Sequence, residues 1–96
     1  MTITKENVIE ALKKVEDPEL LIDVWTLGLI YDMVVQESDV NIKMTFTSPL
    51  CPYGPMLVED MKRKLADIGV KQTHVEIVFE PPWQPNEEVK EMLGLP

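Results

Sequence analysis

The sequence predicts a two-layer α+β fold, in which helices pack on one face of a small mixed sheet. The predicted elements follow one another in the order α-β-β-α-β-α. A short polar turn joins the first two strands and so favours an antiparallel hairpin, whereas the third strand returns through a helix and is expected to run parallel to a neighbour. We expect residues 1–96 to form a single domain.

The first helix is predicted over residues 5–15, where Val8, Leu12 and Val15 recur at helical spacing. Thr4 can cap its start, because a threonine hydroxyl accepts an orphan backbone N–H. Asp17-Pro18 ends it, since the residue before proline disfavours the α region. Residues 20–28 are apolar without a clear period, and we interpret them as an extended or loop segment.

Three strands are predicted over residues 29–36, 40–46 and 73–79. The first is hydrophobic on both faces apart from Asp32, so it is predicted to lie centrally in the sheet. The second alternates apolar and polar residues, which predicts one buried face. In the third, Val75, Ile77 and Phe79 are expected to point inward.

A second helix is predicted over residues 55–68, and Gly69 suits the left-handed position that ends it. An alternative start makes Pro52 the first helical residue, with Cys51 as its cap. A short last helix over residues 87–93 has Asn86 as cap and Gly94 as stop.

Charge and composition exclude several classes of function. Seventeen Asp and Glu against nine Lys and Arg give a net charge of −8, which disfavours nucleic acid and anionic membranes as partners. No apolar run approaches the ~20 residues of a membrane span, and the N-terminus does not resemble a signal peptide. A single cysteine cannot form an internal disulfide, so we expect a cytoplasmic protein.

Cys51 lies in the stretch TSPLCPYGP, between the end of a predicted strand and the start of a predicted helix. Prolines stiffen this loop, and the positive end of the helix favours a thiolate, which lowers the pKa of the thiol. The competing interpretation is a small buried hydrophobic residue, and the sequence weighs the two about evenly.

Two kinds of chemistry are open to such a thiol. Nucleophilic catalysis needs a base, and the single histidine, His74, lies on a strand where a solvated surface role is the more usual one. Metal binding is the other option, although iron–sulfur clusters usually take four cysteine ligands. One thiolate therefore favours a transient cluster, with further ligands from a recipient, a small thiol or a second copy on a twofold axis.

Four motifs together resemble a known family: EDPEL, LGLIYD, TSPLCP and EPPWQPNEEVKEMLGL, which extend over residues 15–95. They are similar to the SufT/PaaD-like metal–sulfur (iron–sulfur) cluster assembly factors, whose domain also opens many cluster-carrier ATPases. The resemblance implies a small α/β fold and a role in maturing iron–sulfur proteins. It marks Cys51 as the functional residue, in a motif shared with Thr47, and implies that Asp17 and Glu19 lie near the thiol. Where the family often has tryptophan before the proline pair, this sequence has Phe79.

Other residues carry two interpretations each. Asp17 and Glu19 could bind a hard metal, but bonds to the backbone of the turn are favoured. Thr47 could hydrogen-bond the Cys51 thiolate or simply end the strand. Trp83 is expected to anchor the last helix, with a role as a partner-binding hot spot the minority interpretation.

These observations predict a cluster assembly and transfer factor that is not an enzyme and acts through Cys51. Its expected cofactor is at most a transient iron–sulfur cluster. Its expected partners are assembly scaffolds or carriers and client apoproteins, and the ligand count favours a homodimer. The alternative is an adaptor that links the assembly machinery to clients without binding iron itself.

Overall fold

The computed structural model describes residues 3–18, 20–47 and 52–94 of the chain. Its elements in order are α1 (Lys5–Leu12), β1 (Ile30–Gln36), β2 (Asp39–Met44), α2 (Gly54–Asp67), β3 (Gln72–Ile77) and α3 (Glu87–Leu93). The predicted element order is therefore confirmed.

The three strands form one mixed sheet in the order β1-β2-β3. β1 and β2 are antiparallel, with Gln36 opposite Asp39 and Val35 opposite Val40, as a polar turn at residues 37–38 requires. β2 and β3 are parallel, with Ile42 opposite Val75. Both the hairpin and the parallel crossover are as predicted.

β1 lies at an edge of the sheet, so the prediction that it is central is wrong. Its apolar outward residue, Val34, is 42% exposed on the side of the sheet away from the helices. The register shifts between Ile30 and Asp32, so a β-bulge at Tyr31 breaks the simple alternation. The run of apolar residues therefore reflects the bulge and an exposed valine, and the strand is not covered on both faces.

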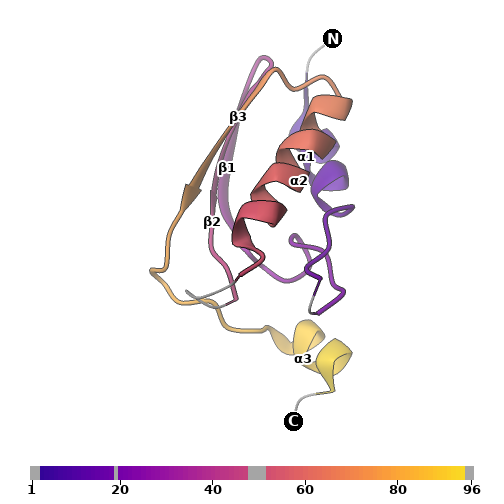
Figure 1. Cartoon of the computed structure of the whole chain (residues 1–96), viewed down its shortest axis with the longest axis vertical. Coiled ribbons are helices and arrows are strands. Elements are labelled where there is room, and N and C mark those ends of the chain that lie inside the picture. Colours follow the sequence, from indigo (N-terminus) through magenta and orange to yellow (C-terminus); the bar gives the residue numbers. More distant parts are fainter. Residues whose placement is uncertain (1–2, 19, 48–51, 95–96) are drawn as a thin grey trace.

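α1 and α2 lie side by side on one face of the sheet, which confirms the two-layer α+β fold (Figure 1). The apolar stripe of α1 and that of α2 meet the inward residues of β1 and β2. The largest fully buried apolar side chains are Leu12, Leu27, Leu29, Met44, Met61 and Leu65. Val75 and Ile77 of β3 are only partly buried and Phe79 is 41% exposed, so the inner side of β3 is less well covered than predicted.

The ends of several elements differ from prediction. α1 ends at Leu12, where a turn takes over, and Val15 is still fully buried beyond it. At its start, the Thr4 hydroxyl accepts from the N–H of Asn7, and the Asn7 side chain accepts from the N–H of Thr4. This reciprocal pair is a capping box and confirms the predicted cap.

The segment that follows β3 is held by a hydrogen bond to β1, by a hydrogen bond to the loop before β1 and by one buried side chain. The Tyr31 hydroxyl donates to the Pro81 carbonyl at 2.7 Å, and the Trp83 indole N–H donates to the Leu27 carbonyl at 2.6 Å. Val89 of α3 is fully buried. α3 therefore sits at the end of the molecule where the C-terminal end of β2 lies (Figure 1), with Asn86 and Gly94 as predicted at its ends. None of the helices in the described ranges is long and apolar enough to cross a membrane.

Candidate functional site

Cys51 and Glu19 lie outside the described residues, so the site is built from the chain on either side of them. Phe46 and Thr47 lead into the cysteine segment from β2, and Pro52 and Tyr53 lead out of it into α2. Both ends of that segment are half-buried or exposed, and the prediction that α2 follows it closely is confirmed.

The N-terminus of α2 has no side chain that caps it or neutralises its positive charge. Its N-cap is Tyr53, whose side chain forms no capping hydrogen bond, and the first helical bond runs from the N–H of Leu57 to the carbonyl of Tyr53. Pro55 in the first turn has no N–H to offer, and the first turn contains no acidic residue. The partial positive charge of the helix end is therefore left without a negative side chain of its own. Because the cap is Tyr53, the alternative helix start with Cys51 as cap is wrong.

An aromatic pair fixes the geometry where β2, α2 and the segment after β3 meet. The rings of Phe46 and Phe79 are in an edge-to-face contact, with centroids 6.4 Å apart and planes at 60°. Gly54 is buried against the same ring, and a Cβ placed on it would lie 2.6 Å from Phe46 Cε2. Only glycine therefore allows the first residue of α2 to pack this closely on Phe46. Phe79, which stands where the family often has tryptophan, thus packs as an aromatic side chain although it is 41% exposed.

Asp17 organises the turn that follows α1. It is 2% exposed, and its Oδ1 accepts from the N–H of Leu20 at 3.1 Å. Its backbone carbonyl accepts from Leu21, and its N–H donates to the carbonyl of Ile22. The turn interpretation of Asp17 is therefore confirmed. Leu21 takes a left-handed φ of 58° and is 71% exposed, so this turn presents an apolar side chain to solvent.

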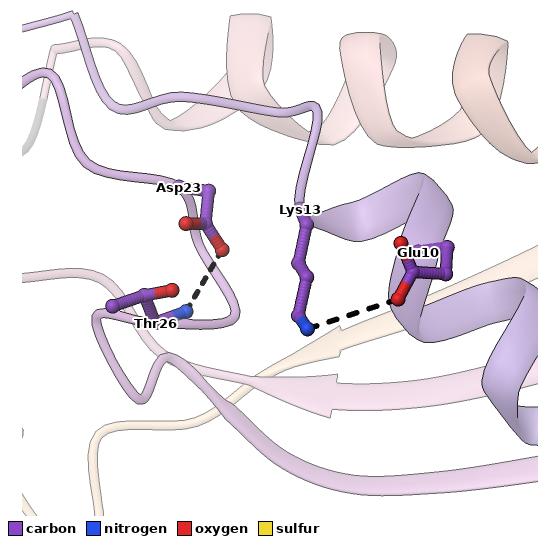
Figure 2. Close-up of polar contacts among 4 residues, drawn as sticks. All are labelled: Glu10, Lys13, Asp23 and Thr26. Atoms are coloured by element: carbon purple, nitrogen blue, oxygen red, sulfur yellow. Dashed lines mark hydrogen bonds and ion pairs between the residues drawn. The ribbon is translucent and has the colours of Figure 1, made fainter.

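A second aspartate extends the same loop. Asp23 Oδ2 accepts from the N–H of Thr26 at 2.9 Å, and Figure 2 shows this bond beside the exposed Lys13–Glu10 ion pair, whose atoms are 3.8 Å apart. An exposed pair of this kind contributes little to stability, whereas the aspartate shapes the backbone. The predicted loop over residues 20–28 is thus built from hydrogen-bonded turns.

The residue before Asp17 lies beside the first turns of α2. Glu16 shares a surface depression of about 290 Å³ with residues of the first three turns of that helix, among them Met56 and Asp60. The turn of Asp17 and the start of α2 therefore belong to the same end of the molecule, as Figure 1 shows. The structure brings Asp17 to this end, and its implied proximity to the Cys51 thiol stays a prediction, because Cys51 lies outside the described residues.

The other predicted residues are placed as follows. Thr47 is half-buried and lies three residues beyond the end of β2 at Met44, so it does not end the strand. Trp83 is half-buried and bonded to Leu27, which confirms its anchoring role. His74 is exposed near the start of β3 opposite Asn41, on the face of the sheet away from the helices. Asn41 precedes the last residue of β2 by three positions, so His74 is about 10 Å along the sheet from the end where the cysteine segment begins.

No group of three or more His, Cys, Asp or Glu side chains able to hold a metal occurs within residues 3–18, 20–47 and 52–94. A metal ligand set formed by the described part of the chain alone is thus absent. Sequence reasoning missed Phe46 and Gly54 as residues of this region. Gly54 could have been recognised from the sequence, because it lies between a proline-rich loop and the apolar positions of the second helix. A glycine at such a place often marks a close approach of the backbone to another segment.

Known proteins resemble this chain closely. The profile of a family described as iron–sulfur cluster assembly protein matches residues 5–77. A relative named Fe-S protein maturation auxiliary factor YitW, from Bacillus subtilis, is 48% identical over 81 residues, which cover 82% of this chain and 79% of the relative. The Fe-S protein maturation auxiliary factor SufT of Staphylococcus aureus is 45% identical over 69 residues, which cover 70% of this chain and 78% of the relative.

The fold agrees with a solved structure. The crystal structure of a domain of unknown function from Bacillus anthracis superposes with a TM-score of 0.86 at 34% identity, covering 96% of this chain and 92% of that one. The family profile and the two relatives cover most of the chain at high identity. This protein therefore belongs to the iron–sulfur cluster assembly protein family.

Proposed function

We propose that this protein is a non-enzymatic factor that receives an iron–sulfur cluster at Cys51 and passes it to a client apoprotein. Membership of the family supports a role in iron–sulfur protein maturation. The cysteine mechanism goes beyond that role, and the following steps give its physical basis.

The observation that carries the proposal is the uncapped start of α2. Cys51 precedes the N-cap residue Tyr53 by two positions in the chain. The first turn of α2 has neither a side-chain cap nor an acidic residue to neutralise the positive end of the helix. Such an end favours an anion, and a thiolate is the form of cysteine that binds iron.

The chain has too few cysteine ligands to keep a cluster, so the cluster is a cargo and not a resident group. An iron–sulfur cluster takes about four protein ligands, and the chain has one cysteine. Among the described residues, no three His, Cys, Asp or Glu side chains are grouped so that they could hold a metal. The remaining iron positions therefore fall to the donor scaffold, the client or a small thiol, and the exchange of these ligands is the transfer step.

The rigid surroundings favour this exchange. Phe46 packs against both Gly54 and Phe79 where β2 and α2 approach, so the described residues on either side of the cysteine segment are anchored to the core. The exposed apolar residues Leu21 and Met56 at the same end offer contact area to a partner protein.

Anaerobic reconstitution with iron and sulfide tests the proposal. The unmodified protein should develop visible charge-transfer absorption, and Cys51→Ser should lose it while its far-UV circular dichroism stays unchanged. His74→Ala is the matched control, because it removes the only histidine and should keep the absorption. Equal absorption in the Cys51→Ser variant would contradict the mechanism. A colourless protein that still captures a client apoprotein would instead indicate the adaptor function.

A further inference from the structure

Within residues 3–18, 20–47 and 52–94, no strand pairs with the outer edge of β3. Successive residues of a strand direct their N–H and C=O groups to alternate sides. The N–H of Val78 donates to the carbonyl of Met44, so even-numbered residues of this segment face β2. Thr73, Val75 and Ile77 therefore direct their backbone groups away from β2, toward the side where the described part of the chain has no further strand.

The opposite edge of the sheet, formed by β1, has features that oppose pairing with another chain, which β3 lacks. β1 carries a bulge at Tyr31, and the outward N–H of Met33 donates to Asp32 Oδ1 at 2.9 Å. Bulges and charged side chains of this kind blunt an edge against pairing with another chain. β3 has neither a bulge nor a proline nor a lysine over Gln72–Ile77.

We propose that β3 pairs antiparallel with β3 of a second copy of this chain, across a twofold axis at Val75. In this register Val75 faces Val75 of the other copy, and Thr73 faces Ile77. All three outward residues of each strand then exchange backbone hydrogen bonds, because each of these pairs joins residues that face the free edge. Thr73, Val75 and Ile77 are only half-buried on the helix side of the sheet, so the pairing also covers apolar surface.

Side-chain charge selects this register over its neighbours. With Val75 on the axis, His74 of each copy lies opposite Glu76 of the other, at a position where the backbones do not bond and side chains come closest. Imidazole and carboxylate form a hydrogen bond there, twice per dimer. Moving the axis to His74 pairs imidazole with imidazole, and moving it to Glu76 pairs carboxylate with carboxylate. The strand is thus self-complementary in one register.

The resulting dimer has a six-stranded sheet with the C-terminal ends of β2 at its opposite ends, so it differs from the ligand-sharing homodimer that the single cysteine favours. β2 and β3 run parallel, so the C-terminal ends of both point to the same end of one copy. The antiparallel pairing places this end of the second copy at the opposite end of the sheet. Each copy then exchanges its cargo with a client independently. The dimer does not depend on the proposed function, since β3 pairs whether or not Cys51 binds iron.

Sedimentation velocity over a range of protein concentrations tests the pairing. His74→Glu replaces two His–Glu contacts per dimer with two Glu–Glu contacts, and should raise the dissociation constant about ten-fold. The double variant His74→Glu with Glu76→His exchanges the two partners and should restore association. Asn41→Glu is the matched control, because it adds the same charge in the same row of the sheet but on the central strand; its effect should stay within about two-fold.

Hydrogen exchange locates the contact. The amides of Thr73, Val75 and Ile77 should gain protection as the protein concentration rises, while those of exposed loop residues should not. A protein that stays monomeric at all concentrations would overturn the proposal. So would a dimer that responds equally to His74→Glu and Asn41→Glu, or protection of these three amides only when a client is added.

Discussion

Gly54 at the start of α2 gives the sharpest stability test. Helix propensity predicts that Gly54→Ala stabilises the protein, whereas the packing in the structure predicts that it destabilises it. Replacing a helical glycine with alanine ordinarily stabilises a protein by roughly 0.4–1 kcal/mol. Here the new Cβ would lie 2.6 Å from Phe46 Cε2 and 2.7 Å from Cζ. The ring must move by roughly 1 Å to restore an ordinary contact, and overpacking of this kind costs roughly 1–3 kcal/mol.

The net expectation for Gly54→Ala is a loss of roughly 0.5–2 kcal/mol, which lowers the melting temperature by roughly 4–8 °C per kcal/mol in a chain of this size. Urea denaturation measures the free energy of unfolding directly. The edge-to-face contact with Phe79 opposes displacement of the Phe46 ring.

Phe46→Leu supplies the control background. It removes the aromatic ring and so the clash, and in this background Gly54→Ala should become neutral or stabilising. Gly28→Ala should show no such coupling, since a Cβ at Gly28 meets nothing within 4 Å and its cost comes from a φ of 77°. A Gly54→Ala protein that is stabilised in the unmodified background would refute the packing argument.

Three further substitutions test the anchors of the fold, each by urea denaturation. Trp83→Phe keeps an aromatic side chain but removes the indole N–H that bonds the Leu27 carbonyl, and should cost roughly 0.5–1.5 kcal/mol of stability. An unchanged stability would show that water replaces this N–H. Asp17→Ala removes the buried acceptor of the Leu20 N–H and should cost roughly 1–3 kcal/mol of stability. Asp17→Asn keeps an oxygen at this position and should cost less. Equal losses in the two variants would show that the negative charge of Asp17, and not the hydrogen bond, is what stabilises the turn. Thr4→Ala breaks the capping box of α1 and should cost roughly 1 kcal/mol, with Lys5→Ala as the neutral comparison.

Most of the fold could be predicted from local patterns. The alternation of β2, the helical stripes and the caps at Thr4, Asn86 and Gly94 each depend on residues close in sequence. The position of β1 could not be predicted in this way. Packing across the whole sheet decides which strand β3 pairs with. In addition, the sequence does not distinguish an exposed valine such as Val34 from a buried one.

The candidate site was predicted in part. Asp17 was correctly assigned to a turn and Trp83 to packing, because aspartate turns and tryptophan anchors have local signatures. The contact of Phe46 with Gly54 and Phe79 could not be predicted, since it joins three segments that are distant in sequence. The roles of Cys51, Glu19 and Thr47 in cluster chemistry stay predictions.

Cluster transfer from the reconstituted protein to an apo iron–sulfur enzyme tests the central claim most directly. Activity of the recipient enzyme should rise when it is mixed anaerobically with the loaded unmodified protein, and should stay at the level given by free iron and sulfide when Cys51→Ser is used. Full activation by the Cys51→Ser protein would contradict the account.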